Sequence, residues 1–321
     1  MAHELSVKEN GKVEFAFTGS RSKVWHTLGN QLTEDAPLET WKVEAGLDWE
    51  VKESPITYRG NGDTIIFADR KALYRSDTTE PLSIVGENYK IVQPEEILEF
   101  FRDLVENNDM KLSTAGCLFG GKRFWALAEL GKNTEIIDGD VVDGYLLLTT
   151  SVDGSISTTA KFVSERVVCN NTLSIAMNEK SQNLVKCSHK SQWDAKAVKI
   201  DLGLLDLGWD NFITDMRKLA STPMTDSQVH SFFTEQFYDK KVPADKQGWG
   251  ATKKVKTLTD LYYSGAGSEL SVGTAWGVLN AVTDLYTHGS GKRDASHQFM
   301  NAFYGSDLVK NKVLEDLLAL A

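Results

Sequence analysis

The chain of 321 residues is long enough to bury one large or two modest cores, and 41% hydrophobic with 25% charged residues is typical of globular proteins. No apolar run reaches the roughly 18 residues that a membrane-spanning helix needs. The net charge is −10 overall, but residues 1–160 carry −11 and residues 161–260 carry +3. This balance argues against a uniformly basic polyanion-binding protein, and it permits a local basic groove in the second half.

Two further features predict a cytoplasmic protein. The N-terminal stretch MAHELSVKENGK lacks the apolar segment of a secretory signal. Cys117, Cys169 and Cys187 are few, odd in number and widely spaced, which favours a reducing compartment without a disulfide framework.

The first 92 residues are expected to form short elements and then a β-meander. Residues 38–45 are predicted to be a short helix that ends at Gly46. From residue 56 onward, clusters of Gly, Asn and Asp separate β-rich runs. The predicted strands are ITYRG, TIIFAD, KALYRSD, LSIVG and YKIVQ.

A helix and a first hairpin are predicted next. Pro94 suits the first turn of a helix over residues 94–108, and apolar residues recur there at helical spacing. Residues 111–130 then read as two strands joined at Gly120-Gly121. Because both faces of the second strand are largely apolar, we expect that strand to be central in a sheet.

Residues 144–178 predict a second hairpin followed by a capped helix. Asp153-Gly154 lies between two β-rich runs and favours a type I′ turn, in which both central residues have positive φ. Asn170, Asn171 and Thr172 precede an apolar run and are typical helix caps, so a helix is expected over about 170–179. NLVKCSHKS is predicted to be one further strand.

From Trp193 onward the pattern is helical, and Thr225 and Ser306 are predicted N-caps. The expected helices cover about 194–220, 225–239, 253–263, 272–288, 293–304 and 307–320. The sequence therefore predicts an α+β fold. An antiparallel sheet of hairpins with packed helices would occupy residues 1–192, and an all-helical region packed on it would occupy residues 193–321.

The catalytic and metal-binding possibilities are weak. Cys169 and His189 could form a thiolate–imidazole pair, but the favoured interpretation is a small buried cysteine and a histidine at a strand end. An acidic run could hold a cation or could be a solvated loop; it comprises Asp138, Asp140, Asp143 and Asp153. We find no nucleotide-binding or metalloprotease motif, so no catalytic residue, metal or cofactor is assigned.

Basic and aromatic residues recur on the predicted strands. Lysine and arginine bind phosphates, and aromatic faces stack unpaired bases without sequence preference. If the strands are neighbours, their polar sides could line a groove for single-stranded nucleic acid; an ordinary solvated sheet face is the alternative. The candidate residues are Lys122, Arg123, Trp125, Lys161, Phe162, Arg166, Lys186 and Lys190.

Several segments spread over most of the chain carry a family resemblance. RVVCNNTL at 166–173 is the most specific of them. The others are HTLGN, AGLDWEV, YRSDT, VGENYKIVQPEEILEFF, TAGCLFGGKRFWALAEL, GDVVDGYLLLTTSVDGS and GTAWGVLNAVTDLYTH. Together they resemble the phage/plasmid-like family known as domain of unknown function 932. One departure is Val152 before Asp153-Gly154, where the family usually has histidine.

The family more distantly resembles the Rad52-like single-strand annealing proteins of phages, which have a helix, an antiparallel sheet of hairpins and a second helix across it. This resemblance implies ATP-independent binding and annealing of single-stranded DNA by a homo-oligomeric ring, in the host cytoplasm if the protein is phage-encoded, with no membrane partner. A protein-interaction factor that acts on a host or defence protein is the alternative, and a Cys/His enzyme is a third hypothesis.

Overall fold

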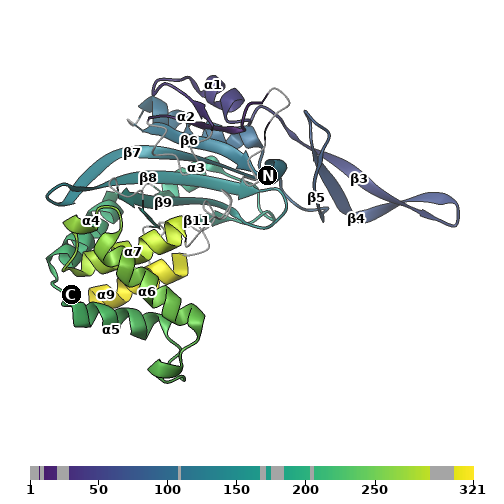
Figure 1. Cartoon of the computed structure of the whole chain (residues 1–321). Helices are drawn as coiled ribbons and strands as arrows, with labels where there is room; N and C mark the ends of the chain where they lie inside the picture. The colour runs from purple at the N-terminus through teal and green to yellow at the C-terminus, as the bar shows by residue number, and fades with distance from the viewer. Residues whose placement is uncertain are drawn as a thin grey trace.

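The computed structural model describes residues 7, 11–19, 29–107, 110–166, 171–174, 184–202, 206–289 and 307–321. It is an α+β fold with a large, mainly antiparallel sheet, a smaller projecting sheet and a C-terminal group of helices (Figure 1). Within these ranges, no helix combines the length and apolarity needed to cross a bilayer.

The main sheet has the strand order β10-β9-β8-β7-β6-β1-β2, and β11 pairs with β9 beside β10. All pairs are antiparallel except β1 with β2. The hairpin strand expected to be central, β7, does lie between two neighbours. The strands are β1 (Phe15–Phe17), β2 (Asn30–Gln31), β6 (Lys111–Leu118), β7 (Arg123–Ile137), β8 (Asp140–Ser151), β9 (Thr158–Arg166), β10 (Asn171–Ser174) and β11 (Leu184–Cys187).

Side chains alternate between the two faces of this sheet. Three helices pack on one face, which we call the α2 face: α1 (Leu38–Glu44), α2 (Pro94–Asn107) and α3 (Ala195–Leu202). Ile97 and Phe101 of α2 are fully buried there against Phe124 and Leu146. The opposite face, the Trp125 face, carries a second buried cluster of Phe15, Phe17, Leu118, Trp125, Leu127, Tyr145, Leu147 and Val163.

A three-stranded sheet projects from this body (Figure 1). It comprises β3 (Val51–Gly60), β4 (Asp63–Arg75) and β5 (Pro81–Gly86). β5 pairs with β4 over residues 70–74, so the distal part of β3 and β4 is a two-stranded hairpin. We call residues 56–69 the arm.

The remaining helices form a second core beside the β9–β10 edge (Figure 1). They are α4 (Asp206–Ser221), α5 (Asp226–Phe237), α6 (Trp249–Ser264), α7 (Ala275–His288) and α9 (Asp307–Leu320). α7 is the central helix, since it is buried on nearly every side. Two indoles attach this bundle to the β7–β8 hairpin: Trp209 donates to Thr134 Oγ1 at 3.3 Å and Trp276 donates to Asp140 Oδ2 at 2.8 Å.

Several predictions are confirmed, including α1, α2, both hairpins, strand β11 and the helical C-terminal region. Thr225 caps α5 in a reciprocal capping box with Gln228.

The predicted helix over 194–220 corresponds to two helices, α3 and α4, which lie on either side of residues 203–205. Helix α3 packs on the sheet, because Val198 belongs to the sheet core. The helices of the second core begin with α4. The predicted helix over 293–304 and the Ser306 cap lie outside the described residues.

The type I′ turn predicted at Asp153-Gly154 is wrong. Six residues, 152–157, connect β8 to β9, and Gly154 has φ +74° whereas Asp153 is not among the positive-φ residues. The Asp153 carboxylate accepts a hydrogen bond from the Ser155 N–H at 2.9 Å. A side chain that bonds its own loop in this way favours a wider turn.

The helix predicted at 170–179 is also wrong where it can be checked. Residues 171–174 form β10, which pairs with β9 from Arg166 to Val163. The unpaired edge of β9 offers backbone partners that outweigh the capping preference of Asn and Thr. In the meander, TIIFAD and KALYRSD form one continuous strand, β4, and YKIVQ forms no strand.

Candidate nucleic-acid interface

Three connections meet at one end of the main sheet. Leu118 pairs with Arg123, Arg123 with Ser151, and Thr158 with Cys187. The β6–β7 turn, the β8–β9 loop and the segment after β11 therefore leave the sheet at the same end. We call residues 119–123, 152–157 and 186–191 the loop end.

The loop end gathers four of the eight predicted site residues. Lys122 immediately precedes β7 and Arg123 begins it, while Lys186 and Lys190 lie on and after β11 and are exposed. Three strand spacings, about 14 Å, separate β7 from β11. Lys90 is exposed and also lies here, because its N–H donates to the carbonyl of His189 at 2.7 Å; no sequence motif marked this residue.

The β6–β7 turn orients Lys122 and Arg123. Phe119, Gly120 and Gly121 have φ values of 57°, 69° and 94°. A Cβ on Gly121 would lie 2.7 Å from the ring of Trp49, so this tight contact with the base of the projecting sheet requires glycine. The Arg123 guanidinium lies 4.8 Å from the ring centre of Phe119.

The charge of Arg123 is directed at the β8–β9 loop. Its Nε donates to Ser155 Oγ at 2.9 Å. Burial alone would raise the pKa of Asp153, but hydrogen bonds from Ser155 and Ser151 and the charge of Arg123 hold that pKa below its ordinary value. Asp153 is therefore anionic at neutral pH and is held within the loop.

His189 connects two of the segments at the loop end. Its ring stacks on Tyr89 with centroids 4.5 Å apart, Nε2 lies 2.9 Å from the Ile156 carbonyl, and Nδ1 lies 3.3 Å from the Lys90 carbonyl. Burial raises the pKa of Tyr89, whose hydroxyl donates to the carbonyl of Ser151. Cys169 lies outside the described residues, so its pairing with His189 stays a prediction.

The other four predicted residues do not join the loop end. Trp125 and Lys161 share the Trp125 face, where they are 1% and 4% exposed. Phe162 is on the α2 face, half-buried between the sheet core and the helical core. Arg166 lies at the far end of β9, opposite Val142, and its side chain is outside the described part.

The acidic run has a structural use. Asp140 is fully buried and accepts the Trp276 indole N–H, while Asp143 lies on β8 opposite Asn133. Among the residues that the structure describes, no group of three potential metal ligands is close enough to hold an ion.

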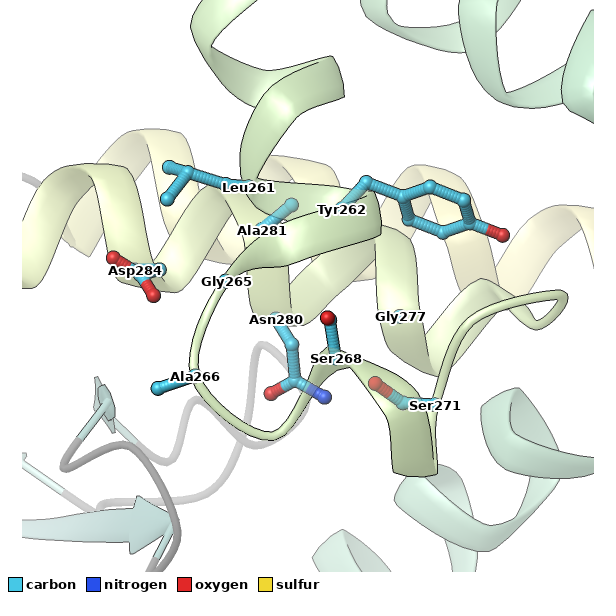
Figure 2. A pocket seen from close by; sticks show the side chains of 10 residues that line it. All are labelled: Leu261, Tyr262, Gly265, Ala266, Ser268, Ser271, Gly277, Asn280, Ala281 and Asp284. Carbon is cyan, nitrogen blue, oxygen red and sulfur yellow. The ribbon is translucent and has the colours of Figure 1, made fainter.

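A small cavity in the bundle does not fit an organic ligand. Tyr262, Ser271, Asn280 and Asp284 are among its lining residues (Figure 2), and its volume is about 10 Å³. That volume accommodates about one water molecule. The buried Ser271 hydroxyl, for which the described structure supplies no hydrogen-bond partner, is suited to bind such a water.

Comparison with known protein families gives one match. A family model described as domain of unknown function (DUF932) matches residues 81–303. No curated protein and no solved structure matches the chain.

Proposed function

Since the chain belongs to the DUF932 family, whose model covers most of it, we propose that it binds and anneals single-stranded DNA. In this proposal it is a homo-oligomeric recombination protein of a phage or mobile element, and it works without ATP. The family description itself assigns no activity, so the proposal rests on the loop end.

The observation that carries the proposal is the gathering of Lys122, Arg123, Lys186 and Lys190 at the loop end of a chain whose net charge is −10. The neighbouring Asp153 carboxylate accepts the Ser155 N–H within its own loop, and Arg123 donates to the Ser155 hydroxyl. A phosphate backbone that crosses these loops would meet several cations and would release counterions on binding.

The arrangement of elements adds support for a Rad52-like core. α2 precedes and packs on a sheet built from the β6–β7 and β8–β9 hairpins, which is the order expected of that core. The strand β10 occupies part of the position where a second helix was expected.

The first test removes two exposed cations at the loop end. We expect Lys186→Gln/Lys190→Gln to weaken binding of a labelled dT20 oligonucleotide about tenfold. The slope of log K against log salt concentration should also become shallower by about 1.4, because each contact to a single-strand phosphate contributes about 0.7 to that slope. The matched control is Lys111→Gln/Lys312→Gln, which removes the same charge at exposed sites away from the loop end. Equal affinities and slopes for the two variants would exclude the loop end as the binding site.

The second test addresses assembly. Mass photometry of the full chain at low and moderate salt, with and without dT20, should detect a large species that takes up DNA in a salt-sensitive way. A discrete small species that does not respond to DNA would contradict the annealing proposal.

One observation favours the alternative of a protein-interaction factor. The arm extends away from the body (Figure 1) and exposes Tyr58, Ile65, Ile66 and Phe67, with Ile66 63% exposed. An isolated two-stranded hairpin is at best marginally stable in water, and exposed apolar clusters often mark protein interfaces. A stoichiometric partner recovered from nuclease-treated host lysate, and lost in Ile66→Ser/Phe67→Ser, would support this alternative.

A further inference from the structure

A second basic surface lies at the end of the bundle farthest from the sheet, where residues 238–248 connect α5 to α6 (Figure 1). We call residues 239–256 the basic tip. They contain six lysines and two aspartates, a net charge of +4 in a chain of net charge −10. The lysines are Lys240, Lys241, Lys246, Lys253, Lys254 and Lys256, and all except the half-buried Lys254 are exposed.

The connection that displays these lysines has a defined shape. The Gln247 side chain accepts from the Asp239 N–H at 2.9 Å and donates to the carbonyls of Asp239 and Val242 at 2.8 and 2.6 Å. Two turn hydrogen bonds, from Val242 to Asp239 and from Lys246 to Pro243, add to this closure. The cations are therefore presented from an ordered loop.

Few of these charges are neutralised locally. Lys256 pairs with Asp260, and Lys254 donates to the Tyr286 hydroxyl. Within the described ranges, no carboxylate forms an ion pair with Lys240, Lys241, Lys246 or Lys253. A cluster of like charges opposes folding through self-repulsion, and a bound polyanion would relieve that repulsion.

An exposed tryptophan stands within this cluster. Trp249 begins α6 and is 77% exposed, whereas Trp41, Trp49, Trp125, Trp209 and Trp276 are buried. Lys253 Nζ lies 4.8 Å from its ring centre. Gly248 and Gly250 flank it, and a Cβ at either position would meet nothing within 4 Å, so the surroundings of the indole are open.

The start of α6 adds a favourable backbone contribution. Among the described residues no side chain caps this helix, whose N-cap is Gly248. Ala251 N–H donates to the Gly248 carbonyl at 3.0 Å, so the N–H groups of Trp249 and Gly250 and the positive end of the helix dipole remain available to an anion.

From this combination we propose that the basic tip is a second contact for a single-stranded polynucleotide, with a base stacked on Trp249 and phosphates bound by Lys246, Lys253 and their neighbours. A flat exposed indole among unpaired cations suits unstacked bases on a phosphate chain, whereas a duplex keeps its bases stacked inside. For its ligand class this inference rests on the proposed function, but the surface is separate from the loop end.

The test uses the full chain, with labelled dT20, rU20 and a 20-base-pair duplex as probes. We expect Trp249→Ala to weaken dT20 binding about tenfold, because stacking is worth about 1–3 kcal/mol per base. We also expect dT20 to quench tryptophan emission in the wild type and to quench it much less in Trp249→Phe. Lys246→Gln/Lys253→Gln should lower the salt slope by about 1.4 relative to the Lys111→Gln/Lys312→Gln control.

The outcomes separate this inference from the proposed function. Since the substituted side chains are exposed, the thermal unfolding midpoint should stay unchanged. If the basic-tip variants bind as the wild type does while the loop-end variant is weakened, the basic tip is excluded and the proposed function stands. If the wild type binds no single-stranded oligonucleotide, both the inference and the proposed function fail.

Other ligands give further tests. Equal affinity for duplex and single strand, or Trp249-dependent binding to phosphatidylserine vesicles without binding to dT20, would also overturn the inference. The rU20 probe shows whether the site prefers DNA or RNA.

Discussion

At the scale of single residues, the most unusual group is a buried ionic network. Arg75 donates to both carboxylate oxygens of Glu14, at 2.7 and 3.0 Å, and to both oxygens of Asp77. Its guanidinium lies 4.2 Å from the ring centre of Trp49. Burial raises the pKa of the Cys117 thiol well above its ordinary value, and the adjacent Glu14 carboxylate raises it further. The network joins the residue before β1, the base of the projecting sheet and β6.

Breaking this network at one partner should be strongly destabilising. We expect Glu14→Leu to lower the free energy of unfolding by about 3–5 kcal/mol, because Arg75 would remain buried with only the partly exposed Asp77 carboxylate. Glu14→Leu/Arg75→Met should recover most of that loss, because no buried charge is left. Urea unfolding measures both variants, and a loss below about 1 kcal/mol in the single variant would contradict the prediction.

At the scale of elements, the sequence predicted a feature correctly where the residues that form its hydrogen bonds are close together in the chain. The α5 capping box uses Thr225 and Gln228, three residues apart, and it was visible as a cap in the sequence. The predicted turn type of the β8–β9 connection and the helix predicted in place of β10 were both wrong. The loop depends on the Asp153 side chain, and β10 depends on an edge strand that local propensity does not report.

The capping box gives an element-scale prediction. Thr225→Ala removes the side-chain oxygen that accepts the Gln228 N–H, so the free energy of unfolding should fall by about 1 kcal/mol. Thr225→Ser keeps that oxygen and should retain most of the stability. If both variants unfold at the same urea concentration, the cap contributes nothing through this hydrogen bond.

At the scale of the whole molecule, the two cores meet along the β7–β8 hairpin. Ile136 and Val142 of this hairpin belong to the helical core, while other residues of the same strands belong to the sheet core. Trp276 reinforces the junction through the buried Asp140. We therefore expect the sheet and the bundle to unfold together.

Trp276→Phe tests this junction. It preserves most of the ring volume and leaves the buried Asp140 carboxylate without the indole donor, so the free energy of unfolding should fall by about 2 kcal/mol. Near-ultraviolet and far-ultraviolet circular dichroism should give coincident urea transitions in the wild type. Two separated transitions in the wild type would show that the cores are independent.

The sequence by itself determined the α+β class, helix α2, the β6–β7 hairpin and the helical C-terminal region, because periodicity and turn residues act over a few positions. Only the tertiary structure decided which cations gather. Strand register brings Arg123 and Lys186 to one end of the sheet and places Lys161 on a buried face. The sequence shows that lysines surround Trp249. It does not predict that the indole is exposed, because burial depends on residues that are distant in the chain. The Arg75–Glu14 pair joins residues 61 positions apart, a contact that folding alone creates.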